Sequence, residues 1–231
     1  IIFSCLPTSA DVEALISANT PKKGSIWVDC TSGLPNSANK LSAQLGQIGV
    51  DYLDAPVSGQ TIGAERGTLT IMIGGDFKAF EKAKPIIQAF AGLIEYVGES
   101  GSGFAVKAVN NTLMATHLWA LAEGLTVLKS KGVDLSAALS CINASSGKSN
   151  ISENIMAQRV LNRKFEKTFA LDLLQKDIGI AVDLVEQANL ELSAMKLIQH
   201  EFNLIEKSEA SQLDFSAAVQ SLERKSSIQL N

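Results

Sequence analysis

The sequence predicts an α/β protein in which a partial doubly wound sheet is followed by an all-helical C-terminal domain. Three observations support this prediction. Short apolar segments alternate with helical segments over the first hundred residues, a long helical pattern without proline comes next, and the later segments are also helical in their periodicity. We therefore expect two domains, residues 1–100 and residues 101–231.

The elements of the first domain follow one another in a strand–helix order. Short apolar runs predict the strands, and longer runs with helical spacing predict the helices between them. The predicted strands are Ile1–Pro7, Ser25–Thr31, Asp51–Val57, Leu69–Ile73 and Leu93–Val97, and the predicted helices are Ser9–Ala18, Asn36–Ile48 and Phe77–Phe90. Asp11 or Ser9 is expected to cap the first helix, and Pro35 suits the start of the second. This alternation predicts a mostly parallel sheet.

Helices account for the whole of the second domain. Gly103–Lys131 has apolar residues at spacings of three to five, as a core-facing stripe requires. The helices expected after it are Leu135–Ala144, Ser152–Leu161, Ala170–Gln187, Ser193–Glu206 and Phe215–Ser221. Gly132 and Gly147 separate these segments.

Composition and charge narrow the class of protein. A hydrophobic content of 46% and a charged content of 19% are typical of a soluble globular protein, and the longest apolar stretch carries too many polar side chains to span a membrane. The net charge of −4 provides no basic surface for a phosphate backbone, so no nucleic acid partner is expected. Cys5, Cys30 and Cys141 form no CxxC pair, which suits a reducing compartment. His117 and His200 lack ligand spacing, so no metal is expected.

The start of the chain indicates a missing segment. The sequence opens on an apolar strand, without an initiator methionine or a signal peptide, so we expect its natural N-terminus to lie upstream. A doubly wound nucleotide-binding domain begins with a strand, a GxGxxG turn and a helix, and no GxGxxG occurs in the sequence. Either the sheet starts elsewhere, or that unit precedes Ile1. We expect a cytoplasmic location, and the missing N-terminus leaves an organellar one open.

A first candidate for chemistry is the segment Asp54–Gly75, DAPVSGQTIGAERGTLTIMIGG. Its Ser58–Gly59 turn follows a strand, so backbone N–H groups and one hydroxyl are able to converge on a carboxylate. Gly59 has no side chain and lets a ligand approach the backbone closely. The alternative interpretation is a plain strand-to-helix turn.

A second candidate is the segment Gly98–Met114, GESGSGFAVKAVNNTLM. Lys107 and Asn111 are one helical turn apart and share a helix face just after a glycine-rich entry. An ammonium near the positive end of a helix dipole is expected to have a lowered pKa, which favours proton exchange with a hydroxyl. The alternative interpretation is a solvated surface lysine.

A third candidate is the segment Phe169–Leu184, FALDLLQKDIGIAVDL. Lys176 and Asp177 interrupt an otherwise apolar helix. A surface ion pair explains them simply, and a polar pair that points into an interdomain cleft is the functional alternative.

Taken together, these segments resemble the β-hydroxyacid dehydrogenases, the family of 3-hydroxyisobutyrate dehydrogenase and tartronate semialdehyde reductase, and the resemblance extends over essentially the whole chain. It implies the C-terminal part of a Rossmann domain and an NAD(P)-dependent 3-hydroxyacid dehydrogenase. It also implies that Ser58 and Gly59, with Gln60 beside them, bind the substrate carboxylate. Lys107 is then the general acid/base, and Asn111 orients the substrate and the lysine.

The resemblance also implies a cofactor, NAD or NADP, and residues that contact it. The expected cofactor-binding residues are Leu6, Pro7, Asp11, Ser32, Lys176 and Asp177. Leu6 and Pro7 would contact the nicotinamide half, and Asp11 and Ser32 would lie near its ribose. The residue that distinguishes NAD from NADP belongs to the segment expected upstream, so both coenzymes stay open.

Substrate and assembly are expected only in outline. Gln60 replaces the second glycine of the family's usual SGG turn, which narrows the carboxylate pocket or adds an amide contact. IGAERGTLTIM is closer to tartronate semialdehyde reductases, whereas INASSGKSN resembles L-threonate dehydrogenases. The resemblance therefore implies a small hydroxy acid or semialdehyde as the substrate and leaves open which one. The long Gly103–Lys131 helix agrees with a homodimer or homotetramer.

Three other classes of protein are alternatives to a β-hydroxyacid dehydrogenase. The main alternative is a non-catalytic scaffold paralogue, which would have no reason to keep together the four residues Lys107, Asn111, Ser58 and Lys176. Imine reductases commonly replace the lysine, and 6-phosphogluconate-type dehydrogenases are much longer, so the sequence favours a β-hydroxyacid dehydrogenase over both.

Overall fold

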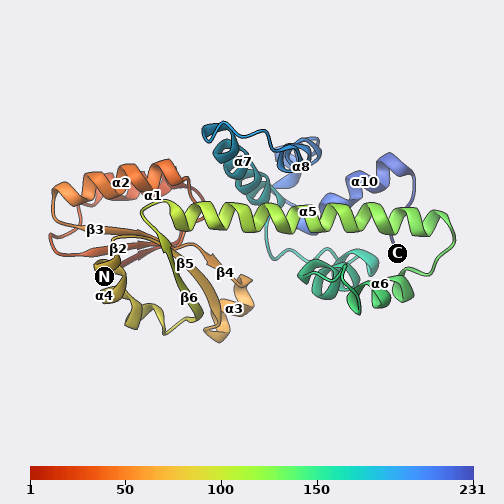
Figure 1. Ribbon diagram of the computed structural model, residues 1–231, viewed down its shortest axis with the longest axis horizontal. Coiled ribbons are helices and arrows are strands. Elements are labelled where there is room, and N and C mark those ends of the chain that lie inside the picture. The colour runs from red at the N-terminus through yellow and green to blue at the C-terminus, as the bar shows by residue number, and fades with distance from the viewer. The chain divides into compact units, whose positions relative to one another are not determined.

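The chain forms two compact units in the computed structural model, which describes residues 1–231 apart from the side chains of residues 207 and 208 (Figure 1). The first unit, residues 1–109, contains a sheet with helices, and the second, residues 110–231, is helical. This confirms the predicted fold class. The division between the units falls inside helix α5, Ser102–Ser130, and the expected domains 1–100 and 101–231 stay a prediction.

The first unit contains a six-stranded sheet. Its elements are β1 Ile2–Ser4, α1 Ser9–Ala18, β2 Ile26–Asp29, α2 Pro35–Gln47, β3 Asp51–Asp54, β4 Val57–Ser58, α3 Gln60–Arg66, β5 Leu69–Gly75, α4 Phe77–Ile87 and β6 Ala91–Gly98. The strand order is β1-β2-β3-β5-β4, and β6 also pairs with β5. Strands β1, β2 and β3 are parallel to one another, as are β5 and β6.

Strand β5 departs from the mostly parallel sheet that the sequence predicts, because it runs antiparallel to both β3 and β4. A parallel return needs a crossover that carries the chain back to the starting edge of the sheet. The connection from β3 to β5 is instead occupied by β4, which pairs back onto β5, and by the short helix α3. The chain therefore re-enters the sheet in the opposite direction.

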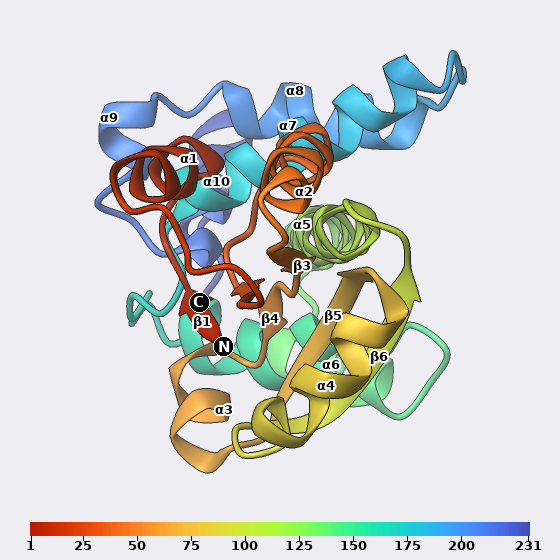
Figure 2. The ribbon, with the colours of Figure 1, turned by 90° about the vertical axis from the view of Figure 1, so that its left-hand side faces the viewer.

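Both faces of the sheet are covered, with α1 and α2 on one side and α4 on the other (Figure 2). Alternate strand residues serve the two sides, because successive side chains of a strand point to opposite faces. Trp27 and Tyr52 pack with α1 and α2, whereas Val28 and Leu53 pack in the cluster that includes residues of α4. The strand ends therefore lie on a rigid, two-sided core.

The start of α1 corrects one expectation from the sequence. The N-cap is Thr8, and neither Asp11 nor Ser9 takes that position. The Thr8 hydroxyl accepts a hydrogen bond from the Asp11 backbone N–H at 3.3 Å, and the Asp11 carboxylate accepts one from the Thr8 N–H at 3.0 Å. Asp11 is thus the third residue of a capping box. Helix α2 begins at Pro35, as expected.

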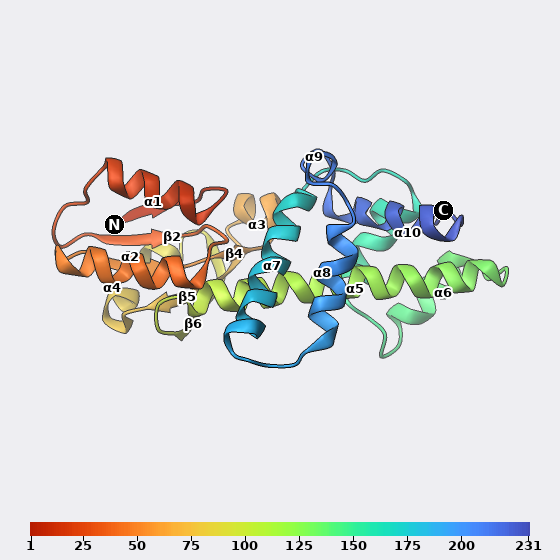
Figure 3. The same ribbon diagram turned by 90° about the horizontal axis from the view of Figure 1, so that it is seen from above.

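The second unit is built from helices around one core. After α5 come α6 Leu135–Asn143, η1 Ile151–Leu161, α7 Leu171–Gln187, α8 Ser193–Asn203, α9 Lys207–Ala210, η2 Phe215–Ala218 and α10 Val219–Ser226. Helices α7 and α8 lie side by side (Figure 3). The expected helix Ser152–Leu161 is present as a π-helix, and Phe215–Ser221 divides into a 3-10 turn and the start of α10. None of the helices that the structure describes is long and apolar enough to cross a bilayer.

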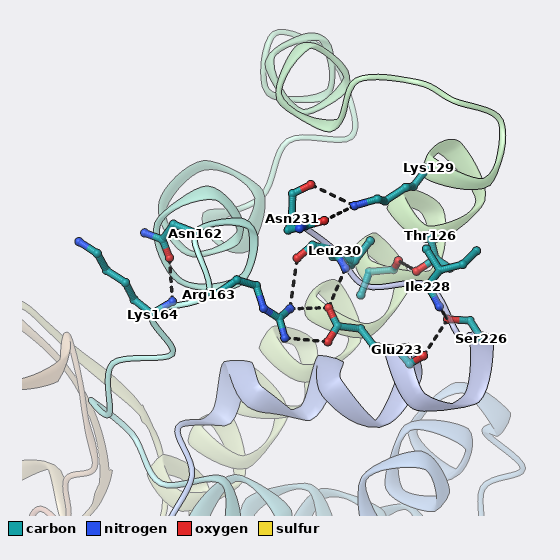
Figure 4. Close-up of polar contacts among 11 residues, drawn as sticks. Thr126, Lys129, Asn162, Arg163, Lys164, Glu223, Ser226, Ile228, Leu230 and Asn231 are labelled. Atoms are coloured by element: carbon teal, nitrogen blue, oxygen red, sulfur yellow. Dashed lines mark hydrogen bonds and ion pairs between the residues drawn. The ribbon is translucent and has the colours of Figure 1, made fainter.

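A network of polar contacts ties residues 228–231 to the second unit (Figure 4). Arg163 and Glu223 form a bidentate ion pair, with Nη1–Oε1 at 2.5 Å and Nη2–Oε2 at 3.0 Å. The same carboxylate accepts the backbone N–H of Leu230 at 2.7 Å, and Lys129 hydrogen-bonds Asn231. Bidentate pairs fix geometry as well as charge, so this segment is held in one place.

Candidate active site

Several candidate residues of the first unit lie where its strands end. Leu6 and Pro7 follow β1, and Ser32 follows β2. Ser58 ends β4, which continues from the end of β3. Ligands of doubly wound sheets bind outside the carboxyl ends of the parallel strands. The structure therefore places Leu6, Pro7 and Ser32 at the edge of the sheet where a ligand is expected, and Ser58 four residues beyond the end of β3.

The buried carboxylate of Asp29 holds this edge together. Asp29 is 1% exposed and accepts hydrogen bonds from the Ser4 hydroxyl at 3.0 Å, the Tyr52 hydroxyl at 2.7 Å and the Thr31 backbone N–H at 3.1 Å. Burial, together with the Asp29 charge, raises the pKa of Tyr52, so its hydroxyl stays a donor. The Thr31 hydroxyl in turn accepts the Leu6 N–H at 3.0 Å. The loops after β1 and β2 are thus joined by side chains.

These loops offer groups that suit the nicotinamide half of a dinucleotide. Leu6 is half-buried and Pro7 is exposed, which provides an apolar surface for a ring. Ser32 is half-buried and Asp11 is exposed, so a hydroxyl and a carboxylate are available for ribose hydroxyls. The residues fit that half of the group. No GxGxxG turn occurs among the 231 residues to bind a pyrophosphate.

The turn after β4 has an unusual backbone. Gly59 has φ +137°, and a Cβ there would lie 3.0 Å from Leu69 Cδ2, so the position requires glycine. Gln60 follows with φ +58°, a left-handed conformation that non-glycine residues adopt at a cost. Ser58 is half-buried, and both Gly59 and Gln60 are exposed. The short helix α3, which starts at Gln60, was not predicted from the sequence.

Lys107 lies in the second turn of α5 and is 8% exposed. The alternative interpretation of a solvated surface lysine is therefore wrong. Burial of a lysine is unusual, because its side chain loses hydration and is mostly exposed in folded proteins. Burial of this kind is typical of lysines that take part in proton transfer.

The helix that carries Lys107 begins against the sheet. Asp54, the last residue of β3, is fully buried, and it accepts the backbone N–H of Gly101 at 2.7 Å and that of Phe104 at 3.0 Å. Burial raises the pKa of Asp54, and the hydrogen bonds from these two amides oppose the increase. Neither Asp54 nor Asp29 was predicted from the sequence as a site residue. The available signal was an acidic residue at the end of an apolar strand, in IWVD and in DYLD.

A second polar group lies within the helical unit. The Asn111 amide donates to Asp177 Oδ2 at 2.6 Å, and Lys176 Nζ lies 3.2 Å from Asp177 Oδ1. Asn111 is 3% exposed and Asp177 is 1% exposed, so the interpretation of Lys176 and Asp177 as a surface ion pair is wrong for the aspartate. A carboxylate without water around it fixes the orientation of the amide that it accepts.

A metal site needs several suitable ligands close together. Among the residues that the structure describes, no group of three or more histidine, cysteine, aspartate or glutamate side chains is arranged to hold a metal ion. The three cysteines are free.

Comparison with known proteins identifies the two units. The first, over residues 1–98, matches the family model described as the NAD binding domain of 6-phosphogluconate dehydrogenase. Residues 101–222 match the model described as NAD-binding of NADP-dependent 3-hydroxyisobutyrate dehydrogenase. A doubly wound unit and a helical unit that both match such models define an NAD(P)-dependent oxidoreductase.

Individual relatives agree with this class. The chain is 38% identical over 197 residues to 2-(hydroxymethyl)glutarate dehydrogenase of Eubacterium barkeri, covering 83% of this chain and 65% of that protein. It is 34% identical over 228 residues to 2-hydroxy-3-oxopropionate reductase of Escherichia coli, covering 96% of this chain and 78% of that protein. The structure of Mycobacterium tuberculosis 3-hydroxyisobutyrate dehydrogenase with L-serine superposes with a TM-score of 0.84 at 26% identity, over 95% of this chain and 78% of that one. The chain belongs to the β-hydroxyacid dehydrogenase family.

Proposed function

We propose that the protein transfers a hydride between NAD or NADP and a small β-hydroxy acid or its semialdehyde, with Lys107 as the proton-transfer residue. The observation that carries this proposal is the burial of Lys107, 8% exposed, on a helix whose start is hydrogen-bonded to Asp54, the last residue of β3. The proposal is supported by the relatives, one of which is named as a reductase of 2-hydroxy-3-oxopropionate.

The substrate carboxylate is assigned to the turn after β4. Backbone N–H groups at Ser58 and Gly59, and the Ser58 hydroxyl, are donors suited to a carboxylate. The absence of a Cβ at Gly59 leaves the backbone open to close approach. Gln60, which is exposed, adds an amide at the rim and is proposed to influence which substrates fit.

Lys107 is assigned to the proton transfer to and from the substrate oxygen. The coenzyme supplies the hydride in the reductive direction and accepts it in the oxidative direction. During reduction Lys107, as an ammonium, donates a proton to the carbonyl oxygen as it becomes an alkoxide. During oxidation the neutral amine takes the hydroxyl proton. Asn111, whose amide donates to Asp177, is proposed to orient the substrate and the lysine.

The contacts to the coenzyme are proposed from the same resemblance. Leu6 and Pro7 are assigned to the nicotinamide ring, and Asp11 and Ser32 to the adjoining ribose. Lys176 and Asp177 are assigned to the far side of the cofactor site. These assignments are supported for the first four residues by their place after β1 and β2, at or near the carboxyl edge of the sheet.

Assembly and location complete the proposal. We propose a homodimer or homotetramer that forms through α5, on which Val106 is 40% exposed, Leu113 is 49% exposed and Val127 is 60% exposed. We propose the cytoplasm as the compartment, because the three cysteines are free and a reducing environment keeps them so.

The decisive experiment compares activity with coenzyme binding. The protein is assayed for NADH and NADPH oxidation with tartronate, methylmalonate and succinate semialdehydes. Lys107→Ala is expected to lower kcat by about 10²- to 10⁴-fold with similar coenzyme affinity, because a general acid/base contributes roughly that factor. Lys131→Ala, at an exposed lysine just after the same helix, serves as the matched control and is expected to leave kcat unchanged.

Two other outcomes of this assay would contradict different parts of the proposal. A protein that binds coenzyme but reduces none of the semialdehydes contradicts the substrate class. A protein that binds neither coenzyme contradicts the dehydrogenase proposal, and the scaffold alternative then takes its place.

A further inference from the structure

We propose that Asp54 is a positioning residue, which fixes the start of α5, and with it Lys107, against the strand that leads to Ser58. The inference rests on the proposed function, because its readout is the turnover that Lys107 supports. All the residues that carry it belong to the first unit.

The hydrogen bonds of Asp54 bracket the first turn of α5. Its Oδ1 accepts the Gly101 N–H at 2.7 Å, and its Oδ2 accepts the Phe104 N–H at 3.0 Å. The first amides of a helix have no partner within the helix, and an anion is the favoured acceptor for them. A cap normally comes from the residue just before the helix. Here the acceptor comes from a strand 47 residues earlier in the chain, so the helix start is tied to the sheet.

Burial of the Asp54 carboxylate costs free energy unless hydrogen bonds replace its lost hydration. The residue is 0% exposed, and burial raises its pKa because a carboxylate loses its hydration. Hydrogen bonds from Gly101 and Phe104 compensate in part by stabilising the charged form. The carboxylate thus depends on the helix start as much as the helix start depends on the carboxylate.

Gly74 of β5 and Gly103 of α5 allow the start of α5 to pack directly against the backbone of the sheet. A Cβ at Gly103 would lie 2.4 Å from the Met72 carbonyl oxygen and 2.7 Å from that of Asp54. A Cβ at Gly74 would lie 2.7 Å from Asp54 Oδ1 and 2.8 Å from Oδ2. Real Cβ atoms do not come so close to other atoms, so any side chain at these positions would displace the contact. The direct bonds from carboxylate to amide therefore require this packing.

Asp54 joins two parts of the proposed site. Ser58 follows it by four residues along the chain, and Lys107 follows Phe104 by three, which is less than one helical turn. A change at Asp54 consequently moves the helix that carries Lys107 relative to the segment that binds the substrate carboxylate. Misplacement of a reacting group by about 1 Å lowers a rate by as much as about 10²-fold.

The test uses a neutral isostere and a matched control. Asp54→Asn is expected to lower kcat by about 10- to 100-fold, with the coenzyme Kd unchanged, because one of the two amides would then face an NH₂ group. Asp51→Asn changes the exposed first residue of the same strand and is expected to leave kcat unchanged. In a Lys107→Ala background, Asp54→Asn is expected to cause no further loss, because residues that act as a unit are not additive.

A second variant keeps the charge and moves it. Asp54→Glu keeps the carboxylate and displaces it by one methylene from the two amides, so it is expected to lower kcat with the coenzyme Kd unchanged, and it tests the contact even if Asp54→Asn does not fold. Unchanged kcat in a folded Asp54→Asn protein overturns the inference, as does an equal fold-loss with and without Lys107. Absence of turnover in the wild-type protein overturns the proposed function instead, so the two failures are distinguishable.

Discussion

Replacing Asp177 by asparagine tests whether the buried polar group of the helical unit orients Asn111. Asp177 is 1% exposed, its Oδ2 accepts the Asn111 amide at 2.6 Å, and Lys176 Nζ lies 3.2 Å from Oδ1. Asparagine keeps the shape and one neutral acceptor, and it removes the negative charge. A hydrogen bond to a charged group contributes roughly 1.5–3 kcal/mol and a neutral one roughly 0.5–1.5 kcal/mol. The difference, about 1–1.5 kcal/mol, corresponds to about a tenfold fall in kcat.

The assay measures kcat at saturating coenzyme and, separately, the coenzyme Kd. Asp183→Asn is the matched control, because Asp183 is an exposed aspartate of the same helix, α7, and its replacement is expected to change neither quantity. A higher coenzyme Kd with an unchanged kcat would refute the orienting role and support the cofactor contact that the sequence suggested for Asp177. No change in either quantity would show that the Asn111–Asp177 bond has no part in turnover.

Three further predictions concern stability and reactivity. A hydrogen bond from Lys40 lowers the pKa of Glu13, so the stabilisation by this carboxylate is present above its unfolded pKa and is lost as the pH falls through its folded pKa. Glu13→Gln is therefore expected to cost up to about 1 kcal/mol at neutral pH and nothing at a pH below the folded pKa, as measured by thermal unfolding. Burial raises the pKa of Cys30 to about 12, so peptide mass spectrometry is expected to show alkylation roughly 100-fold slower than at the exposed Cys141, and equal rates would contradict this. Gln60→Gly is expected to raise the free energy of unfolding by about 0.5 kcal/mol, because it relieves a left-handed φ of +58°; denaturant titration that shows a decrease would contradict the strain.

The elements were predictable from local patterns, and their ends were less so. The apolar run Ile1–Pro7 predicts one strand, yet β1 stops at Ser4, because the next residues form the loop at the sheet edge. Apolar composition does not separate a buried strand from an apolar loop that packs beside it. The cap of α1 shows the same limit, since Thr8, Ser9 and Asp11 are all suitable capping residues and only the backbone conformation at Thr8 decides among them.

Strand direction was not accessible from periodicity. A strand pattern is the same whether the strand runs parallel or antiparallel, so the reversal of β5 depended on the connection before it. The short helix α3 in that connection has only seven residues and an exposed glycine-rich start, which gives little hydrophobic signal. The period of Ser152–Leu161 likewise indicated a helix without distinguishing a π-helix from an α-helix.

Part of the candidate site was likewise predictable from the sequence, and part of it was not. Lys107 and Asn111 were identifiable because they are one turn apart on one helix, which a sequence displays directly. The contacts of Asp54 with the start of α5 join residues far apart in the sequence, and no local pattern contains them. Burial of Asp177 was equally hidden, because its partner Asn111 belongs to another helix.

The glycines beside Asp54 also limit how this protein can be redesigned. Because a Cβ at Gly74 or Gly103 would collide with carboxylate or carbonyl oxygens, a mutagenesis library gains no useful variants at these two positions. Residues of α3 are exposed apart from Gly63, so they accept many side chains at little cost in folding. Directed evolution toward new substrates is therefore expected to find tolerated substitutions in α3, beside the Ser58–Gly59 turn. It is not expected to find them where the start of α5 packs against β3 and β5.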